Sequence, residues 1–322
     1  MNLPFLRKFF LFFKPNSSGF LLHLRQGFDI LIEMKTVSMH IEPMIIGKKA
    51  FDFSKRTYVM GILNVTPDSF FDGGKYFSVE TAVTRAMEMI EQGADIIDVG
   101  GESTRPKGVY GDTQKISIDE ELNRVIPVIE RIVKSTDAVI SIDTTKSKVA
   151  DEALKAGASI VNDISGLKFD EGIASITAKH RATLVVMHIQ GTPETMQQNP
   201  KYFDVVAEVK NELHQSIEKA KSAGVRNIII DPGIGFGKNL EHNLKLLKHL
   251  KEFQELGHPI LIGTSRKGFI GTLLNATADE RIEGTAASVA VSITNGANII
   301  RVHDVKEMKR VAVVTDAIQN VQ

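Results

Sequence analysis

A repeated order of strand-like and helix-like segments runs from Thr57 to the C-terminus, and no other feature of the sequence constrains the fold as strongly. Eight short apolar runs, rich in Ile and Val, are typical of strands that are covered on both faces. Between them, apolar residues recur at helical spacing, as Leu122, Val125, Ile126 and Ile129 do. The expected strands are 58–63, 95–100, 138–143, 159–163, 183–188, 227–231, 259–265 and 298–303.

Eight strand-then-helix units predict a parallel sheet that closes into a (β/α)8 or TIM barrel, which is an α/β fold. The alternative is an open, doubly wound sheet, which calls for a Gly-rich dinucleotide turn after the first strand. That turn reads NVTPDSF and lacks the motif. We therefore expect one barrel domain at 45–322, with a kink at Pro127 and an additional short helix (FIGTLLN) after the seventh strand.

The first 44 residues do not follow this order. The apolar run after Lys8 is only FFLFF, and Lys14 with Pro15 ends it, whereas a spanning helix needs about 20 mostly apolar residues. We expect no stable membrane insertion, and we interpret residues 1–44 as an N-terminal extension that is poorly ordered or non-native. An amphipathic segment at a membrane surface and a targeting signal stay open as alternatives.

The composition excludes several kinds of site. The formal net charge is +0, so no nucleic-acid partner is expected, and the sequence has 0 Cys, which removes disulfides, thiolate–metal sites and a catalytic Cys. The stretch PGIGFGKN fails the phosphate-loop pattern at its first and last positions. Ser265 lacks the G-x-S-x-G turn of a serine nucleophile. His188 has no second ligand at metal-binding spacing, so we expect a plain polar role for it.

Polar side chains stand where nearly every expected strand ends, and in a TIM barrel those ends form the mouth of the active site. A single Asp there could simply cap the next helix, but helix caps do not require acidic, amide and basic groups to converge. Carboxylates and an amide suit a flat heterocycle with several N–H groups, whereas Arg suits phosphate. A substrate with a ring and a phosphate tail is therefore predicted. The strand-end residues are Asn64, Asp98, Asp143, Asn162, Asp163, Met187, His188, Asp231, Ser265, Arg266, Lys267, Arg301 and His303.

The segment after the first strand, NVTPDSFFDGGKYF, is longer than the usual connection of about 2–6 residues. Long loops on rigid scaffolds tend to carry function. With this loop and the strand ends in place, seven motifs in chain order resemble those of the dihydropteroate synthase family. They are MGILNVTPDSF, IDVGGESTRPKG, ISIDTTK, VNDISG, DPGIGFGK, GTSRKGFIG and RVHDV. The resemblance spans about residue 45 to the C-terminus. It implies an enzyme of folate biosynthesis that joins 6-hydroxymethyl-7,8-dihydropterin diphosphate to 4-aminobenzoate and releases diphosphate.

The resemblance also implies where the diphosphate lies. Thr104, Arg301 and His303 are expected to bind it, together with a Mg²⁺ ion held by Asn64. Diphosphate leaves readily only when its charge is neutralised, which these groups would achieve.

The same resemblance assigns the pterin ring to the other strand ends. Asp143, Asp231 and Lys267 are the expected catalytic residues, since acceptors stabilise the positive charge that develops on the pterin methylene group. The residues expected to bind or flank the ring are Asp143, Asn162, Ile164, Met187, Asp231, Phe236 and Lys267.

For 4-aminobenzoate, the resemblance implies a site built by the loops after the first two strands, which order over the bound diphosphate. Phe70 and Pro106 are expected beside its ring, and sulfonamides, which look like 4-aminobenzoate, are expected to follow it. Gly268 departs from the larger residues of the family and could alter the rim of this site. A homodimer through the last helices and a cytoplasmic location are also implied. Two alternatives stay open: a pterin-binding methyltransferase domain and a non-catalytic homologue.

Overall fold

The computed structural model describes residues 20–24, 28–32, 41–66, 79–102 and 116–321, and the structural statements below concern these residues. The chain divides into two compact units, Met1–Met39 and His40–Gln322. In the first unit, β1 (Phe20–Leu24) and β2 (Phe28–Ile32) pair as an antiparallel hairpin. The remainder of the expected N-terminal extension lies almost entirely outside the described residues, and its boundary near residue 45 stays a prediction.

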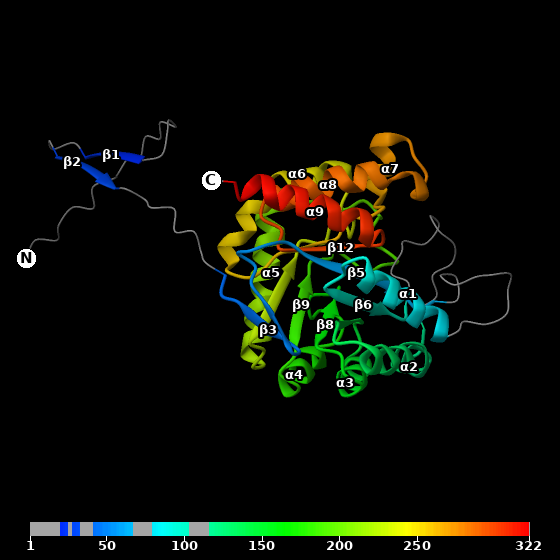
Figure 1. The fold of residues 1–322 in the computed structure, drawn as a ribbon. Helices are drawn as coiled ribbons and strands as arrows, with labels where there is room; N and C mark the ends of the chain where they lie inside the picture. Colours follow the sequence, from blue (N-terminus) through cyan, green and yellow to red (C-terminus); the bar gives the residue numbers. More distant parts are fainter. Residues whose placement is uncertain (1–19, 25–27, 33–40, 67–78, 103–115, 322) are drawn as a thin grey trace, which may run out of the picture. The chain divides into compact units, whose positions relative to one another are not determined.

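The second unit contains the eight parallel strands of a (β/α)8 barrel, as the alternating pattern predicts (Figure 1). Seven pairs of neighbouring strands are hydrogen-bonded in the sheet, and β12, the last strand in the chain, pairs with β5. A parallel bridge between Ile230 and Ile260 joins β10 to the residue before β11 and closes the ring. The strands are β5 (Tyr58–Asn64), β6 (Ile96–Gly100), β7 (Val139–Asp143), β8 (Ile160–Asp163), β9 (Thr183–Met187), β10 (Asn227–Asp231), β11 (Leu261–Ile262) and β12 (Ile299–Val302).

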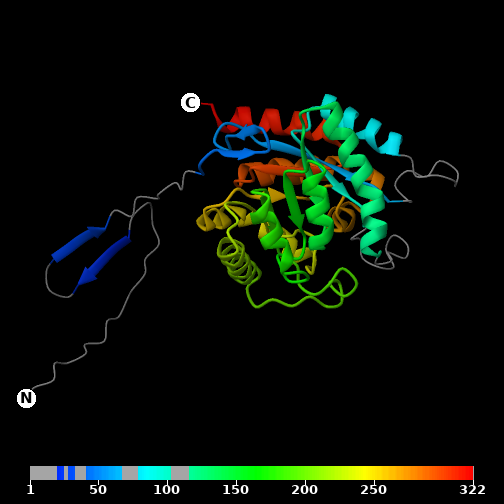
Figure 2. The same ribbon diagram turned by 90° about the horizontal axis from the view of Figure 1, so that it is seen from below.

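Helices follow the strands and lie around the outside of the barrel, which Figure 2 shows from below. The additional helix predicted after the seventh strand is α7, and α2 continues through Pro127. None of the helices in the described ranges is long and apolar enough to cross a membrane. The helices are α1 (Val79–Glu91), α2 (Ile118–Ser135), α3 (Ser147–Lys155), α4 (Gly172–Lys179), α5 (Val205–Ser222), α6 (Leu240–Lys248), α7 (Gly268–Leu274), α8 (Ile282–Thr294) and α9 (Val305–Gln319), with short 3-10 turns at Leu250–Leu256 and Ala278–Glu280.

Two details differ from the sequence-based expectations. The seventh strand was expected at 259–265, but β11 covers only Leu261–Ile262. Part of the reason is that Asn298 Oδ1 accepts the backbone N–H of Ile260, at 2.9 Å. Ile318 follows the apolar period of the last helix but is 69% exposed, so this end of α9 does not face the barrel.

The lower interior of the barrel is an apolar layer. Each barrel strand contributes a buried side chain to it, with Tyr58 as a second one from β5, and a small hairpin of β3 (Met44–Ile46) and β4 (Lys49–Phe51) packs beneath. The Phe51 and Tyr58 rings lie 4.6 Å apart between their centroids. This layer gives the mouth above it a rigid base. Its other barrel-strand residues are Met60, Ile96, Val139, Ile160, Val185, Ile229, Leu261 and Ile299.

Strand alternation then determines which side chains reach the mouth. Successive strand residues point to opposite faces, so Val59 and Leu63 pack outward into the cluster shared with the helices. Residues two positions beyond the apolar layer point inward again, one level closer to the carboxyl ends. On six strands these inward residues are Asp98, Ser141, Asn162, Met187, Asp231 and Arg301. The backbone period therefore turns residues far apart in the sequence towards one interior space.

Candidate active site at the carboxyl ends of the strands

Arg301 stands at the centre of the mouth and joins two carboxylates from other strands. Its Nε donates to Asp98 Oδ2 and its Nη2 donates to Asp143 Oδ2, both at 2.6 Å. Although burial works against its charge, Asp98 and Asp143 raise the pKa of Arg301. The guanidinium is therefore permanently charged, and it links β12 to β6 and β7.

Asp98 is an organising residue that the sequence analysis placed at a strand end without giving it a role. It is fully buried, and its Oδ2 also accepts from Asn162 Nδ2 at 3.0 Å. Asp98 therefore orients both Arg301 and Asn162. Among the described residues, Asp98 Oδ1 and Ser141 Oγ are buried without a hydrogen-bond partner. Buried polar atoms are normally satisfied, so these two atoms mark a place for a ligand or a water.

Asp143 and Asp231 have carboxyl groups whose ionisation is held back by their surroundings. Burial raises the pKa of Asp143 to about 7, against the opposing effect of Arg301. Burial also raises the pKa of Asp231 to about 6, against the N–H of Gly233 and the charge of Lys267. In their ionised forms both carboxylates can accept a ligand N–H strongly, because little water competes with it.

The loop after β10 forms one wall of the mouth. The backbone N–H of Gly233 donates to Asp231 Oδ1 at 2.7 Å, which orients the carboxylate. Phe236, farther along the loop, packs with an apolar group from two other strand ends. Lys267 Nζ lies 4.0 Å from the centroid of the Phe236 ring, a cation–π contact. The apolar wall comprises Ile164, Met187, Ile189, Met196 and Phe236.

The segment after β11 is tied to neighbouring elements. Arg266 adopts a φ of +57° and binds Asp304 through Nε and Nη2, at 3.0 and 2.6 Å. Ser265 Oγ lies 3.0 Å from His303 Nδ1 and accepts the backbone N–H of His303 at 3.2 Å. These contacts bring Lys267 and His303 to the same side of the mouth, as their strand-end positions predict.

Lys146 anchors the described residues that flank 103–115. Its Nζ donates to Glu102 on one side and to the carbonyl oxygen of Ile116, at 3.1 Å, on the other. It also binds the buried Glu121 at 2.6 Å. Sequence analysis did not single out Lys146, although it follows Asp143 in the ISIDTTK motif. Thr104 and Pro106, and Phe70 in the earlier loop, lie outside the described residues, so their predicted roles stay predictions.

Asn64 ends β5 on the inward-facing register of Met60, beside Gly100 of β6. In the described part of the chain, no group of three or more His, Cys, Asp or Glu side chains could hold a metal ion. Mg²⁺ usually keeps several waters and takes one or two protein oxygens plus substrate phosphates. An amide oxygen such as that of Asn64 is a type of ligand that a Mg²⁺ ion of this kind can take.

The fold and the mouth together define a TIM barrel with carboxylates, an amide and a guanidinium gathered at the carboxyl ends of its strands. The sequence model of the family described as pterin binding enzyme matches residues 60–303, which include the strand ends described above.

Relatives narrow this class. The dihydropteroate synthase of Bacillus subtilis (strain 168) is 49% identical over 288 residues, which cover 89% of this chain and 95% of the relative. The crystal structure of dihydropteroate synthase from Clostridium difficile in the presence of pteroic acid is 47% identical with a TM-score of 0.78, covering 84% of this chain and 100% of that one. The Yersinia pestis dihydropteroate synthase with a sulfonamide drug complex is 40% identical with a TM-score of 0.81, at 87% and 100% coverage. This chain belongs to the dihydropteroate synthase family.

Proposed function

We propose that the mouth of this barrel carries out the dihydropteroate synthase reaction through the residues at its strand ends. The enzyme condenses 6-hydroxymethyl-7,8-dihydropterin diphosphate with 4-aminobenzoate to give 7,8-dihydropteroate and diphosphate in folate biosynthesis. The observation that carries the residue assignment is the inward convergence of Asp143, Asn162, Asp231 and Arg301 beside an apolar wall. Neither a methyl-transfer domain nor a non-catalytic homologue accounts for this set as well, since Arg301 and His303 are both present to bind a diphosphate.

Pterin recognition follows from the shape and chemistry of the mouth. Asn162, Asp231 and Lys267 offer an amide, a carboxylate and an ammonium to the polar edge of the ring. The apolar wall that contains Ile164, Met187 and Phe236 covers its face. A ring that satisfies Asp231 by two N–H donors would be held in one orientation.

Bond breaking then depends on electrostatics. The C–O bond to the diphosphate breaks, and the leaving group takes the electron pair. Arg301 and His303 stabilise the negative charge that it carries away. Asp143 and Asp231 stabilise the positive charge that spreads from the methylene carbon into the ring. The amine of 4-aminobenzoate donates its lone pair to that carbon and then loses a proton to water. Mg²⁺, held by Asn64 against the diphosphate, would supply further charge neutralisation to the leaving group.

The order of binding tests this proposal. Phe70 and Pro106 are proposed to complete the 4-aminobenzoate site only after the diphosphate is bound, with Thr104 as one of the diphosphate ligands. Calorimetric titration of 4-aminobenzoate should therefore give no measurable heat with the enzyme alone, and clear binding with Mg²⁺ and diphosphate present (with dihydropterin added to fill the ring site). Ordering a loop costs about 1–2 kcal/mol per residue, and the bound diphosphate is the proposed source that offsets this cost.

A sulfonamide titrated in parallel should behave as 4-aminobenzoate does, since the protein is proposed to be a sulfonamide target at the same site. Diphosphate without Mg²⁺ serves as the control for the metal. Equal affinity for 4-aminobenzoate with and without diphosphate would contradict the proposed order.

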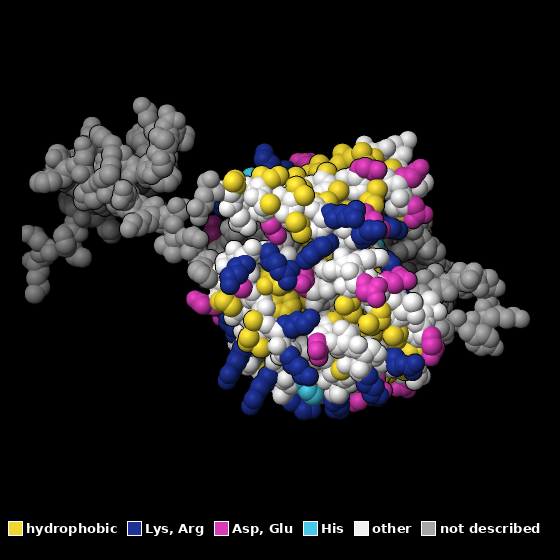
Figure 3. All heavy atoms as spheres, in the orientation of Figure 1, with side chains coloured by type: hydrophobic (Ala, Val, Ile, Leu, Met, Phe, Trp, Pro, Cys, Tyr) yellow, Lys and Arg dark blue, Asp and Glu magenta, His cyan; other side chains and the backbone are white. Residues whose placement is uncertain are grey.

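We also propose that two copies of the chain associate through α7, α8 and α9. Figure 3 shows hydrophobic side chains gathered over α9 and its neighbours, along the upper edge of the view. On α9, Val314 is 58% and Ile318 is 69% exposed, one helical turn apart. Val291 of α8 and Leu274 of α7 are also exposed. Several exposed apolar residues on adjacent helices are typical of a protein–protein contact.

A cytoplasmic location stays an expectation from the family resemblance.

The dimer predicts a mass in solution of twice the 35.5 kDa of one chain, measured by light scattering after size exclusion. The double replacement Val314→Asp with Ile318→Asp should give single chains, because two buried, unpaired charges oppose association. Phe203→Asp is the control, since Phe203 is an exposed apolar residue outside these three helices. A wild-type mass of one chain at micromolar concentration would rule the dimer out.

A further inference from the structure

A buried lysine lies beneath the loop that carries the pterin wall. Lys238 is only 2% exposed, so a substrate in the mouth does not reach it. Its ammonium lies 2.9 Å from the carbonyl oxygens of Gly233 and Phe236 and 2.9 Å from His188 Nδ1. Burying an ammonium is costly unless hydrogen bonds replace its water. These three acceptors do so, which indicates that the position of the charge matters.

The acceptors of Lys238 belong to the segment that shapes the site. Gly233, whose carbonyl binds Lys238, also donates its N–H to Asp231 Oδ1. At Gly233 φ is +72°, and an added Cβ would lie 1.9 Å from the carbonyl oxygen of His188, so only Gly fits. Phe236, the second carbonyl partner, presents its ring to Lys267. The ammonium of Lys238 therefore holds both Gly233, which binds Asp231, and the backbone of Phe236, which belongs to the apolar wall.

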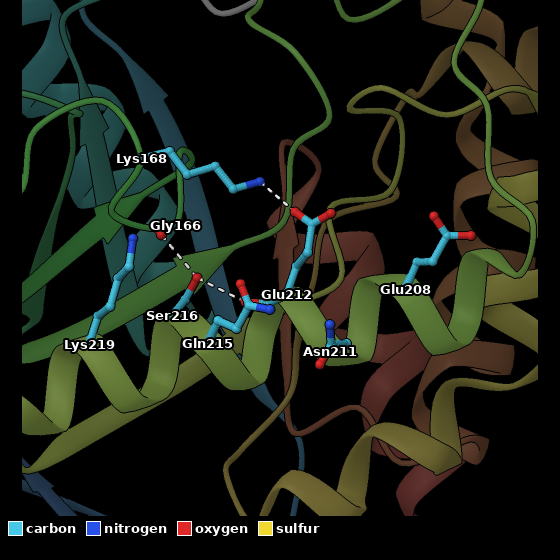
Figure 4. Close-up of a pocket in the computed structure, with 8 residues that line it drawn as sticks. All are labelled: Gly166, Lys168, Glu208, Asn211, Glu212, Gln215, Ser216 and Lys219. Atoms are coloured by element: carbon cyan, nitrogen blue, oxygen red, sulfur yellow. Dashed lines mark hydrogen bonds and ion pairs between the residues drawn. The ribbon is translucent and has the colours of Figure 1, made fainter.

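His188 continues this contact towards the outside of the barrel. Burial, with the charge of Lys238, lowers the pKa of His188 to about 4, so its ring is neutral. A neutral ring that accepts at Nδ1 carries its proton on Nε2. Nε2 faces Glu212 Oε2 at 3.3 Å, a contact too poorly aligned to count as a hydrogen bond. Figure 4 shows Glu212 on α5 paired with Lys168, whose Nζ lies 2.6 Å away, at the edge of an outer pocket.

Three cationic side chains influence the charge of Asp231, and they differ in whether a substrate can reach them. Lys267 from the loop after β11 and Arg301 from β12 stand at the mouth, whereas Lys238 is sealed below it. All three lower the pKa of Asp231, against the larger effect of its burial. Burial in turn lowers the pKa of Lys238 to about 7, with Asp231 opposing the shift and Lys168 and Lys267 adding to it.

We propose that Lys238 is a positioning residue for pterin recognition, which holds Gly233, Phe236 and thereby Asp231 in their binding geometry, with neutral His188 as its side-chain acceptor. The inference rests on the proposed role of Asp231 in binding the pterin ring. Lys238 itself makes no contact with the substrate and acts only through the loop.

The replacement Lys238→Met tests this role, because Met keeps a similar unbranched chain and removes the ammonium. We expect the KM for the pterin diphosphate to rise at least about tenfold, as for loss of a charged hydrogen-bond donor, with the KM for 4-aminobenzoate unchanged. The acidic limb of kcat/KM should move to higher pH, because Asp231 loses one of its three cations. Lys210→Met is the matched control, since Lys210 pairs with Glu255 on the surface of α5.

A pair of replacements at His188 tests the acceptor without removing the charge. Asn places an oxygen near the position of Nδ1, so His188→Asn should keep the wild-type KM for the pterin diphosphate. His188→Leu removes the ring acceptor at 2.9 Å and leaves in its place only the more distant backbone carbonyl of residue 188, at 3.4 Å, so it should raise that KM. This pair decides the proposal even where Lys238→Met fails to fold.

Asp231→Asn separates the two proposals. If Asp231→Asn raises the pterin KM while Lys238→Met changes neither this KM nor the pH profile, the role of Lys238 is overturned and that of Asp231 stands. Equal pterin KM values for His188→Asn and His188→Leu would also overturn it. An unchanged pterin KM in Asp231→Asn would overturn the assignment of Asp231 itself.

Discussion

Replacing Arg301 with Met should lower kcat/KM for the pterin diphosphate by about 10²–10³-fold, the loss typical when a preorganised donor to a developing anion is removed. Arg301 is proposed to stabilise the leaving diphosphate. It also lies between Asp98 and Asp143 and donates one hydrogen bond of 2.6 Å to each carboxylate. The variant would therefore lose both its anion-binding group and the alignment of the two carboxylates. Steady-state kinetics with varied pterin diphosphate measure the change.

The stability of Arg301→Met should depend on pH in a defined direction. Burial already raises the pKa of Asp143 to about 7, and loss of Arg301 removes the charge that opposes this shift. A carboxyl whose folded pKa exceeds its unfolded pKa of about 3.9 destabilises the fold as pH rises between those values. The melting temperature of the variant should therefore fall below wild type by less at pH 5 than at pH 8.

Arg301→Lys is the matched comparison, since Lys keeps the charge and loses the two-pronged geometry. It should retain more stability than Met at pH 8 while still losing activity. A Met variant with wild-type kcat/KM for the pterin diphosphate would show that the reaction needs neither the charge of Arg301 on the leaving group nor the carboxylate alignment that Arg301 provides.

The second large effect is expected at Lys267. Replacing it with Ala removes a charged donor worth about 1.5–3 kcal/mol, so activity should fall by about tenfold or more. The fold should stay intact, because Lys267 precedes α7 and its ammonium lies over the Phe236 ring. Steady-state kinetics and a direct titration of the pterin measure the change.

Lys306→Ala controls for loss of a lysine, since Lys306 is exposed on α9. If Lys267→Ala showed both unchanged turnover and unchanged pterin affinity, the assignment of Lys267 to the pterin site would be wrong.

The barrel was predictable because its signals are local. Short Ile- and Val-rich runs alternate with amphipathic stretches, and the structure has a strand at each of the eight expected places. Strand ends in such a barrel share one mouth, so Asp143, Asn162, Asp231 and Arg301 could be grouped before any distance was known. Their inward direction follows from the two-residue period of a strand.

Local patterns predicted less where packing decides. Ile318 continues the apolar period of α9, yet it is exposed. Helical spacing alone does not show whether an apolar face packs against the barrel or is open to another partner. The seventh strand was predicted at 259–265 but β11 is much shorter, in part because the partner of the Ile260 N–H is the side chain of Asn298 and not a strand.

The sequence by itself determined the order of elements, the family and the residues that reach the mouth, because these depend on spacing along the chain. Only the tertiary structure decided how those residues are paired. Arg301 binds Asp98 and Asp143, which lie 203 and 158 residues away in the sequence. Lys238 contacts His188, which lies 50 residues away. Burial at those meeting points then raises the pKa of Asp231 and lowers that of Lys238. Spacing along the chain predicts neither the pairing nor the burial of these groups. The pairing arises when different strands meet in the closed ring, and the burial arises because that ring excludes water.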